Sequence, residues 1–191
     1  MGKEDKKNRI IQAAIELFEE RGYHKTKVSE IADLAQVAKG TVYWYFESKK
    51  ELFEATAVSK MNEIDQMVNN NILKFNDPIE KLRSIVVSVL NFIEKNKRGA
   101  RMFRESSIAI SKEFKEIIIN YNQNRVELIS TIIDQGIKEE KIKLNIDSQD
   151  AARILLGIVS SFNPHFYQGQ NGKVTDKVDI IMEIFLKGIA S

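Results

Sequence analysis

Apolar residues recur every three or four positions along nearly the whole chain, and no other feature constrains its fold so strongly. This is the period of an α-helix with one buried face. We find no segment with the strict apolar–polar alternation of a half-buried strand. Pro78 and Pro164 are the only prolines in 191 residues, so little in the sequence interrupts helices. The sequence therefore predicts an all-α fold of about nine helices.

The expected helices begin and end where this periodicity does. They cover residues 9–21, 28–36, 39–46, 49–71, 78–96, 100–110, 113–139, 148–167 and 174–189. Gly22 ends the first helix, because glycine is frequent just past a helix C-terminus. Asp77 and Asp147 each precede a helix, where a carboxylate can accept hydrogen bonds from free backbone N–H groups.

The composition argues against several kinds of chemistry. There is no cysteine, which excludes disulfides, cysteine zinc sites and thiol nucleophiles. His24 and His165 are the only histidines, too few for a two-histidine helix motif, and we find no phosphate-binding glycine loop. We therefore expect no enzyme activity, no metal and no cofactor, although acidic pairs cannot be read without a fold.

The ends and the charge of the chain suggest where it works. The N-terminus is charged and lacks the apolar core of a secretion signal. No stretch approaches the roughly 18 apolar residues of a membrane span. We therefore expect a soluble cytoplasmic protein with no membrane partner. The net charge of +2 arises within the first 50 residues, and it is too small to indicate a nucleic-acid surface by itself.

Two short helices, 28–36 and 39–46, are joined by a turn at Gln36. We expect the apolar residues of helix 28–36, Leu34 among them, to face inward. Helices of this length are not stable alone, so the pair must pack on helix 9–21. The second helix then projects from the body. This is the geometry needed to enter a DNA major groove, which is about 12 Å wide.

The composition of helix 39–46 is unusual for a solvated surface. Lys39, Gly40 and Thr41 occupy its start, where free N–H groups favour phosphate and the glycine leaves room for a close approach. Three consecutive aromatic residues follow, at positions 43–45. They cannot all face the core, because consecutive residues lie about 100° apart around a helix. The alternative is a helical hairpin whose aromatic residues cover a core.

Residues 9–53 resemble the DNA-binding domain of TetR-family regulators. The matching motifs are Ile11-Gln-Ala-Ala-Ile-Glu-Leu-Phe, Arg21-Gly-Tyr, Ile31-Ala, Val37-Ala-Lys-Gly-Thr-Val-Tyr-Trp-Tyr-Phe and Ser48-Lys-Lys-Glu-Leu-Phe. The resemblance implies a helix-turn-helix domain over residues 1–48 and a larger helical domain for ligand binding and dimerisation over residues 49–191. It also implies a ligand-responsive transcriptional regulator, a repressor released from a near-palindromic operator when a small molecule binds.

The resemblance also implies which residues contact double-stranded DNA. Lys39 and Thr41 would contact bases or nearby backbone, with Gly40 between them and Ser29 reaching in from the supporting helix. Tyr43, Tyr45 and Lys49 would contact phosphates, while Trp44 has either this role or a structural one. The family often has threonine, a helix cap, at the position of Lys27. Either Thr26 caps helix 28–36 in its place or that helix starts differently, and Lys27 could still bind phosphate.

The C-terminal half is expected to hold the other two partners. Helices 148–167 and 174–189 would form a four-helix bundle with a second copy, or else only close a monomer core. By the resemblance, the effector site would involve Phe92, Met102, Phe103, Tyr121, Phe162 and Phe166, each of which could equally be plain core. The alternative function is a helical ligand-binding or adaptor protein without specific DNA binding.

Overall fold

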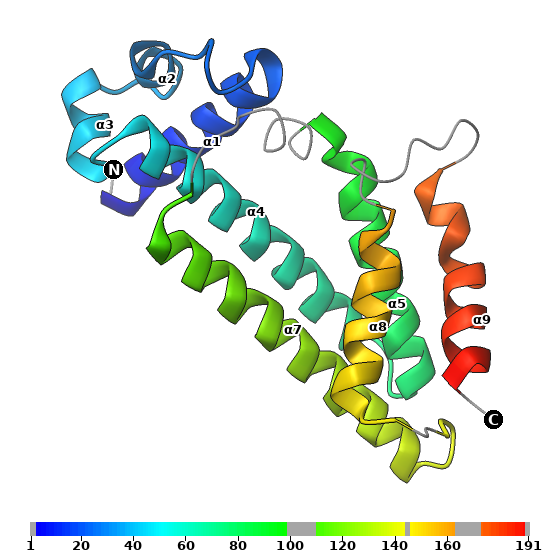
Figure 1. Ribbon diagram of the computed structural model, residues 1–191. Helices are drawn as coiled ribbons and strands as arrows, with labels where there is room; N and C mark the ends of the chain where they lie inside the picture. Colours follow the sequence, from blue (N-terminus) through cyan, green and yellow to red (C-terminus); the bar gives the residue numbers. More distant parts are fainter. Residues whose placement is uncertain (1–2, 99–109, 144–145, 163–172, 190–191) are drawn as a thin grey trace. The chain divides into compact units, whose positions relative to one another are not determined.

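Every element of the computed structural model is a helix (Figure 1). The structure describes residues 3–98, 110–143, 146–162 and 173–189, and within these ranges it has no strand. The elements are α1 (Lys3–Arg21), α2 (Val28–Leu34), α3 (Lys39–Tyr45), α4 (Lys49–Ile72), α5 (Pro78–Lys95), α7 (Lys112–Lys138), α8 (Ser148–Ser160), η1 (Val174–Lys177) and α9 (Val178–Ile189). The predicted all-α class is confirmed.

Two predicted boundaries differ from the structure. Helix α1 begins at Lys3 rather than at residue 9, because charged residues with good helix propensity extend it beyond its apolar stripe. The last predicted helix starts with a 3-10 turn, η1, before α9 begins at Val178. The predicted helix 100–110 and the end of helix 148–167 lie outside the described residues. No helix in the described ranges has the length and apolarity to cross a membrane.

The chain divides into two compact units. The head unit comprises Met1–Glu63 and Lys97–Phe114, and the body unit comprises Ile64–Asn96 and Lys115–Ser191. In the body unit, α5, α8 and α9 pack against one another, and their apolar faces meet α4 and α7 in one core. Asp77 caps α5 as predicted, accepting from the N–H groups of Ile79 and Glu80 at 2.9 and 3.1 Å. The hydrogen bond from Lys141 to Asp77 lowers the pKa of this carboxyl.

The head unit is built around a core to which α1, α2, α3 and α4 all contribute. Its buried residues are Ile10, Ile11, Ala13, Ala14, Ile15, Leu17, Phe18, Val28, Ile31, Ala32, Ala35, Val42, Phe46, Leu52 and Phe53. The predicted stripe of α1 is therefore confirmed. The inward position of Leu34 is wrong, because this side chain is 44% exposed. Leu34 lies about 100° around the helix from Ala35, which occupies the buried face.

Candidate nucleic-acid interface

Helix α3 has one buried side and one exposed aromatic side. Val42 is 2% exposed and Phe46, just after the helix, is 3% exposed, and both belong to the head core. Tyr43 and Trp44 are 47% and 61% exposed, whereas Tyr45 is half-buried against that core. The prediction that at least one of the three aromatic residues is exposed is thus confirmed. The buried side holds α3, and the outer side is available for contact.

Trp44 lies on the surface of the head unit. Its ring meets the ring of Tyr45 edge-on, with centroids 4.6 Å apart and an interplanar angle of 87°. Of the two alternatives that the sequence left open, this position does not fit a side chain sealed in the core. The half-buried Tyr45 instead joins the exposed surface to the core, since it also contacts Phe46 with centroids 6.4 Å apart.

The first turn of α3 presents a cation and an open backbone. Lys39 is exposed, and its Nζ lies 5.9 Å from the centroid of the Tyr43 ring one turn later. A Cβ built on Gly40 would meet nothing within 4 Å, so the packing of the head unit does not require glycine there. Thr41 is half-buried, and its N–H donates to the carbonyl of Ala38 at 2.8 Å.

The start of α2 is capped in a way that the sequence did not predict. Thr26 does not cap α2, because its buried hydroxyl donates to the carbonyls of Leu17 and Gly22, at 3.2 and 2.8 Å. Instead, the carboxylate of Glu30 accepts from the backbone N–H of Lys27 at 2.8 Å. Lys27 is the residue before the helix, as the predicted start requires. Its side chain is exposed, so it is available for a phosphate.

The turn between α2 and α3 contains a residue that sequence reasoning missed. Gln36 has a φ of +54°, in the left-handed region where glycine is favoured. The Gln36 N–H donates to Asp33 at 3.1 Å, and the Val37 N–H donates to Ala32 at 2.9 Å. These bonds close the turn and set the direction in which α3 leaves α2. No sequence signal marks Gln36, because glutamine has no special preference for this conformation.

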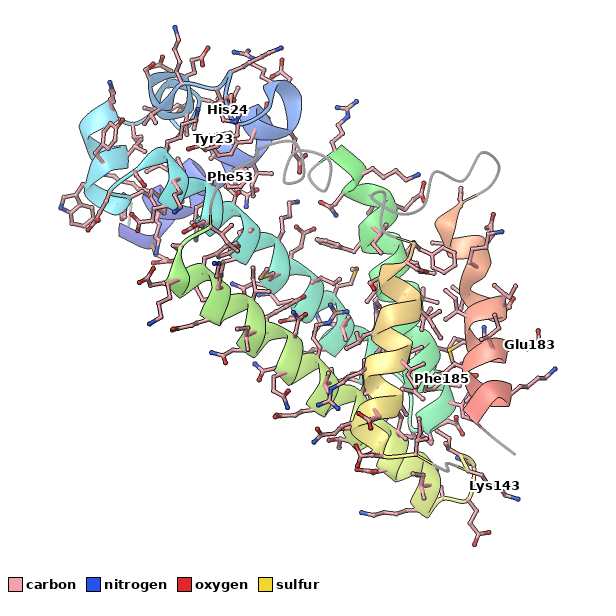
Figure 2. The ribbon with its side chains drawn as sticks, viewed as in Figure 1. Tyr23, His24, Phe53, Lys143, Glu183 and Phe185 are labelled. Carbon is pink, nitrogen blue, oxygen red and sulfur yellow. The ribbon has the colours of Figure 1, made fainter. Side chains whose placement is uncertain are left out.

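Lys49, the first residue of α4, lies against an aromatic cluster. Its Nζ is 4.2 Å from the centroid of the Tyr23 ring. Tyr23 in turn contacts His24 and Phe53 edge-on, with centroids 5.2 and 5.1 Å away (Figure 2). Partial burial lowers the pKa of Lys49, and the nearby charge of Glu30 opposes this shift. Sequence reasoning assigned no role to Tyr23, although it belongs to the Arg21-Gly-Tyr motif.

A buried carboxylate joins α4 to the start of α7 within the head unit. Glu54 is 9% exposed and accepts hydrogen bonds from the backbone N–H and the hydroxyl of Ser111, both at 2.8 Å. The same hydroxyl accepts from the N–H of Phe114 at 3.1 Å and so caps α7. The charge of Glu54 contributes to the raised pKa of Tyr23, after burial of the phenol. The sequence gave no signal for this pair.

The predicted effector residues are only partly described. Phe92, Tyr121 and Phe162 are half-buried and pack against the body core, while Met102, Phe103 and Phe166 lie outside the described residues. Burial raises the pKa of Tyr121 to about 12, and its hydroxyl hydrogen-bonds to Asp65. The described part of the chain has no group of three histidine or acidic side chains placed to hold a metal.

Two family models match this chain. The model described as bacterial regulatory proteins of the tetR family covers residues 10–56. The model described as the tetracyclin repressor-like C-terminal domain covers residues 76–189, more than half of the chain. The chain belongs to the TetR family. The resemblance inferred from residues 9–53 is confirmed, and the chain is a ligand-responsive, DNA-binding transcriptional regulator.

Individual TetR-family relatives match most of the chain. The fatty acid metabolism regulator protein of Bacillus subtilis is 27% identical over 161 residues, which cover 82% of this chain and 81% of the relative. The negative regulator IcaR of the Staphylococcus aureus biofilm operon icaADBC is 29% identical over 187 residues, covering 95% and 99%. The crystal structure of Bacillus subtilis FadR in complex with stearoyl-CoA has a TM-score of 0.79 at 23% identity, covering 95% and 98%.

We expect Tyr43→Ala to weaken binding to the operator and to unrelated duplex DNA by similar factors, because a phosphate contact carries no sequence information. Lys39→Ala should also reduce the preference for the operator, by about 1–3 kcal/mol for a bidentate base contact. Fluorescence anisotropy with labelled duplexes from the region upstream of the gene measures both effects.

Leu34→Ala is the matched control for these two variants. Leu34 is also an exposed apolar side chain of the head unit, but it lies on α2 rather than on α3. Its truncation should leave both affinities unchanged. Wild-type affinities for Tyr43→Ala and Lys39→Ala would remove both residues from the interface.

Proposed function

We propose that this regulator is a repressor, which leaves a near-palindromic operator when a small molecule binds residues 49–191. Residues 1–48 then form its DNA-binding domain. One observation carries the DNA-binding part: Tyr43, Trp44 and Lys39 are exposed on a helix that Val42 and Phe46 fix to the core. The name of IcaR, a negative regulator, supports repression.

In this proposal the exposed side of α3 enters the major groove. Lys39 and Thr41 contact bases or adjacent backbone, and Gly40 allows the backbone to come close, since a side chain there would project into open space. Ser29, on α2, reaches the same groove. Phosphate contacts come from residues around the rim of this surface, namely Lys27, Tyr43, Tyr45 and Lys49, with Trp44 packing against the sugar-phosphate backbone. Such contacts position the protein, while the base contacts select the sequence.

We further propose that helices 148–167 and 174–189 form a homodimer. Ile154 on α8 is 45% exposed, and Ile180 and Ile184 on α9 are 51% and 56% exposed. Ile180 and Ile184 are four residues apart and so share one face of α9. A Cβ on Gly157, one turn after Ile154, would meet nothing within 4 Å, which leaves room for close approach of another helix. Burying each isoleucine would contribute roughly 1.5–3 kcal/mol.

The dimer gives the operator its symmetry. Two copies related by a two-fold axis read two half-sites in opposite orientations, so the operator is near-palindromic. The two DNA-binding domains would meet successive major grooves about 34–36 Å apart. Because the operator is chromosomal, the dimer works in the cytoplasm. The relatives are regulators, and we propose no catalytic activity for this chain.

The effector that we propose to test first is a long-chain acyl-CoA. The support comes from Bacillus subtilis FadR, which is solved with stearoyl-CoA, and from the fatty acid metabolism regulator protein of the same organism. Phe92, Tyr121 and Phe162 remain candidates for its apolar wall, together with Met102, Phe103 and Phe166. A ligand shifts the equilibrium only by binding the released state more tightly than the DNA-bound state. Helix α4, which has residues in both units, would carry that shift.

We expect stearoyl-CoA to release the protein from its operator in a gel-shift assay run at two salt concentrations. Specific retention without ligand tests the DNA-binding function by itself, since non-specific binding falls steeply with salt. Coenzyme A alone should not release the complex. A detergent effect of the acyl chain is checked with an unrelated DNA-binding protein, which stearoyl-CoA should leave on its own site. Full retention in the presence of stearoyl-CoA would exclude this effector class.

We expect Ile184→Asp to convert the dimer to a monomer in sedimentation velocity, because a carboxylate would be buried in an apolar interface. Operator affinity should fall with it. Ile119→Asp is the matched control, since Ile119 is 65% exposed on α7, away from α8 and α9 in sequence. This control should stay dimeric. A wild-type monomer at concentrations that saturate the operator would contradict the proposed assembly.

A further inference from the structure

We propose that Tyr23 is a positioning residue for DNA binding, whose ring holds the ammonium group of Lys49 where it can meet a phosphate of the duplex. The inference rests on the proposed function, in which Lys49 contacts phosphate. Tyr23 itself does not touch the DNA. It acts through Lys49, and the two side chains come from separate parts of the head unit, the α1–α2 loop and the first turn of α4.

The contact between the two side chains has the geometry of a cation–π interaction. The Nζ of Lys49 lies 4.2 Å from the centroid of the Tyr23 ring. Such interactions act within about 6 Å of the ring centroid. The negative face of the ring therefore attracts the ammonium group and limits the rotation of the long lysine side chain.

The Tyr23 ring is itself held in place by other rings. Phe18 and Phe53 are almost fully buried, and their ring centroids lie 5.7 and 5.1 Å from that of Tyr23. His24 adds an edge contact at 5.2 Å, so three rings surround Tyr23 (Figure 2). Because Phe18 and Phe53 belong to the head core, the position of the Lys49 cation is fixed by the packing that also holds α3.

The charges near Lys49 leave its cation available for another anion. Glu30 is the acidic residue whose charge acts on Lys49. Its carboxylate already accepts from the N–H of Lys27 at 2.8 Å and from the guanidinium of Arg21 at 3.1 Å. Half-burial on the Tyr23 ring also removes part of the hydration of the ammonium group, and this lowers the pKa of Lys49. A phosphate would supply the opposite charge that this partly desolvated cation favours.

The position of the Lys49 cation matches the proposed interface. Glu30 belongs to α2, and it connects Lys49 to the start of that helix, where Lys27 and Ser29 are the proposed contacts. A lysine side chain loses up to about 2 kcal/mol of conformational entropy when it is fixed. A cation already restrained by a ring loses less of this entropy when a phosphate binds. Tyr23 would thereby increase affinity for every DNA sequence alike.

The test compares Tyr23→Leu, Tyr23→Phe, Lys49→Gln and the double variant Tyr23→Leu/Lys49→Gln. Operator affinity is measured over a series of salt concentrations. Lys49→Gln should lower the slope of log affinity against log salt by about 0.9, the value for one lost phosphate contact. Tyr23→Leu should lower affinity about two- to fivefold and reduce the slope in the same direction. Tyr23→Phe keeps an aromatic face and should behave as wild type.

The double variant separates positioning from plain packing. If the ring acts through Lys49, adding Tyr23→Leu to Lys49→Gln causes no further loss of affinity. An equal loss in both backgrounds would mean that Tyr23 only supports the core, and the proposal would be overturned. Thermal unfolding by circular dichroism checks that the variants are folded at the temperature of the binding assay.

The geometry can also be tested without DNA. The Lys49 Hε protons should show an upfield ring-current shift in the NMR spectrum of the full chain, retained in Tyr23→Phe and lost in Tyr23→Leu. Absence of that shift in the wild type would overturn the proposal. If Lys49→Gln bound the operator as tightly as the wild type, the proposal would fail while the regulator function stood. Loss of that function would instead be visible as failure of the wild type to bind any operator.

Discussion

The insertion of Val42 and Phe46 into the head core is the interaction on which the DNA-binding surface depends. A seven-residue helix is not stable in water by itself, so α3 exists only because its inner side is buried. Phe18 and Phe53 meet edge-on beneath it, with ring centroids 5.5 Å apart. With Val42 inside, the helical period places Tyr43 and Trp44 outside. The exposure of these aromatic residues is thus a consequence of packing.

The same core organises the rest of the head unit. It supports the Tyr23 ring under Lys49, and the hydroxyl of Thr26 ties the α1–α2 loop to the last carbonyls of α1. Glu54 anchors the first turn of α7 to α4 through Ser111. Charged and aromatic groups at the surface are therefore positioned by buried neighbours. A surface positioned in this way binds DNA with little reorganisation, which favours affinity.

The sequence predicted the elements better than the contacts between them. Periodicity alone placed the helices, and the capping carboxylate of Asp77 was recognised from its position before Pro78. Leu34 was misplaced because a short helix offers too few apolar residues to define its buried face. The pairing of Lys49 with Tyr23 could not be predicted, because the residues are distant in sequence and a cation–π contact leaves no periodic pattern. The left-handed Gln36 was missed because its residue type does not indicate that conformation.

The central claim is that α3 reads the major groove in two successive half-sites. Dimethyl sulfate protection of the operator tests it directly, because the reagent methylates guanine N7 in the major groove and adenine N3 in the minor groove. We predict protection of guanine N7 in two patches on one side of the duplex, about 34–36 Å apart, with adenine N3 remaining reactive between them. Protection confined to adenine N3, or a single protected patch, would contradict the account.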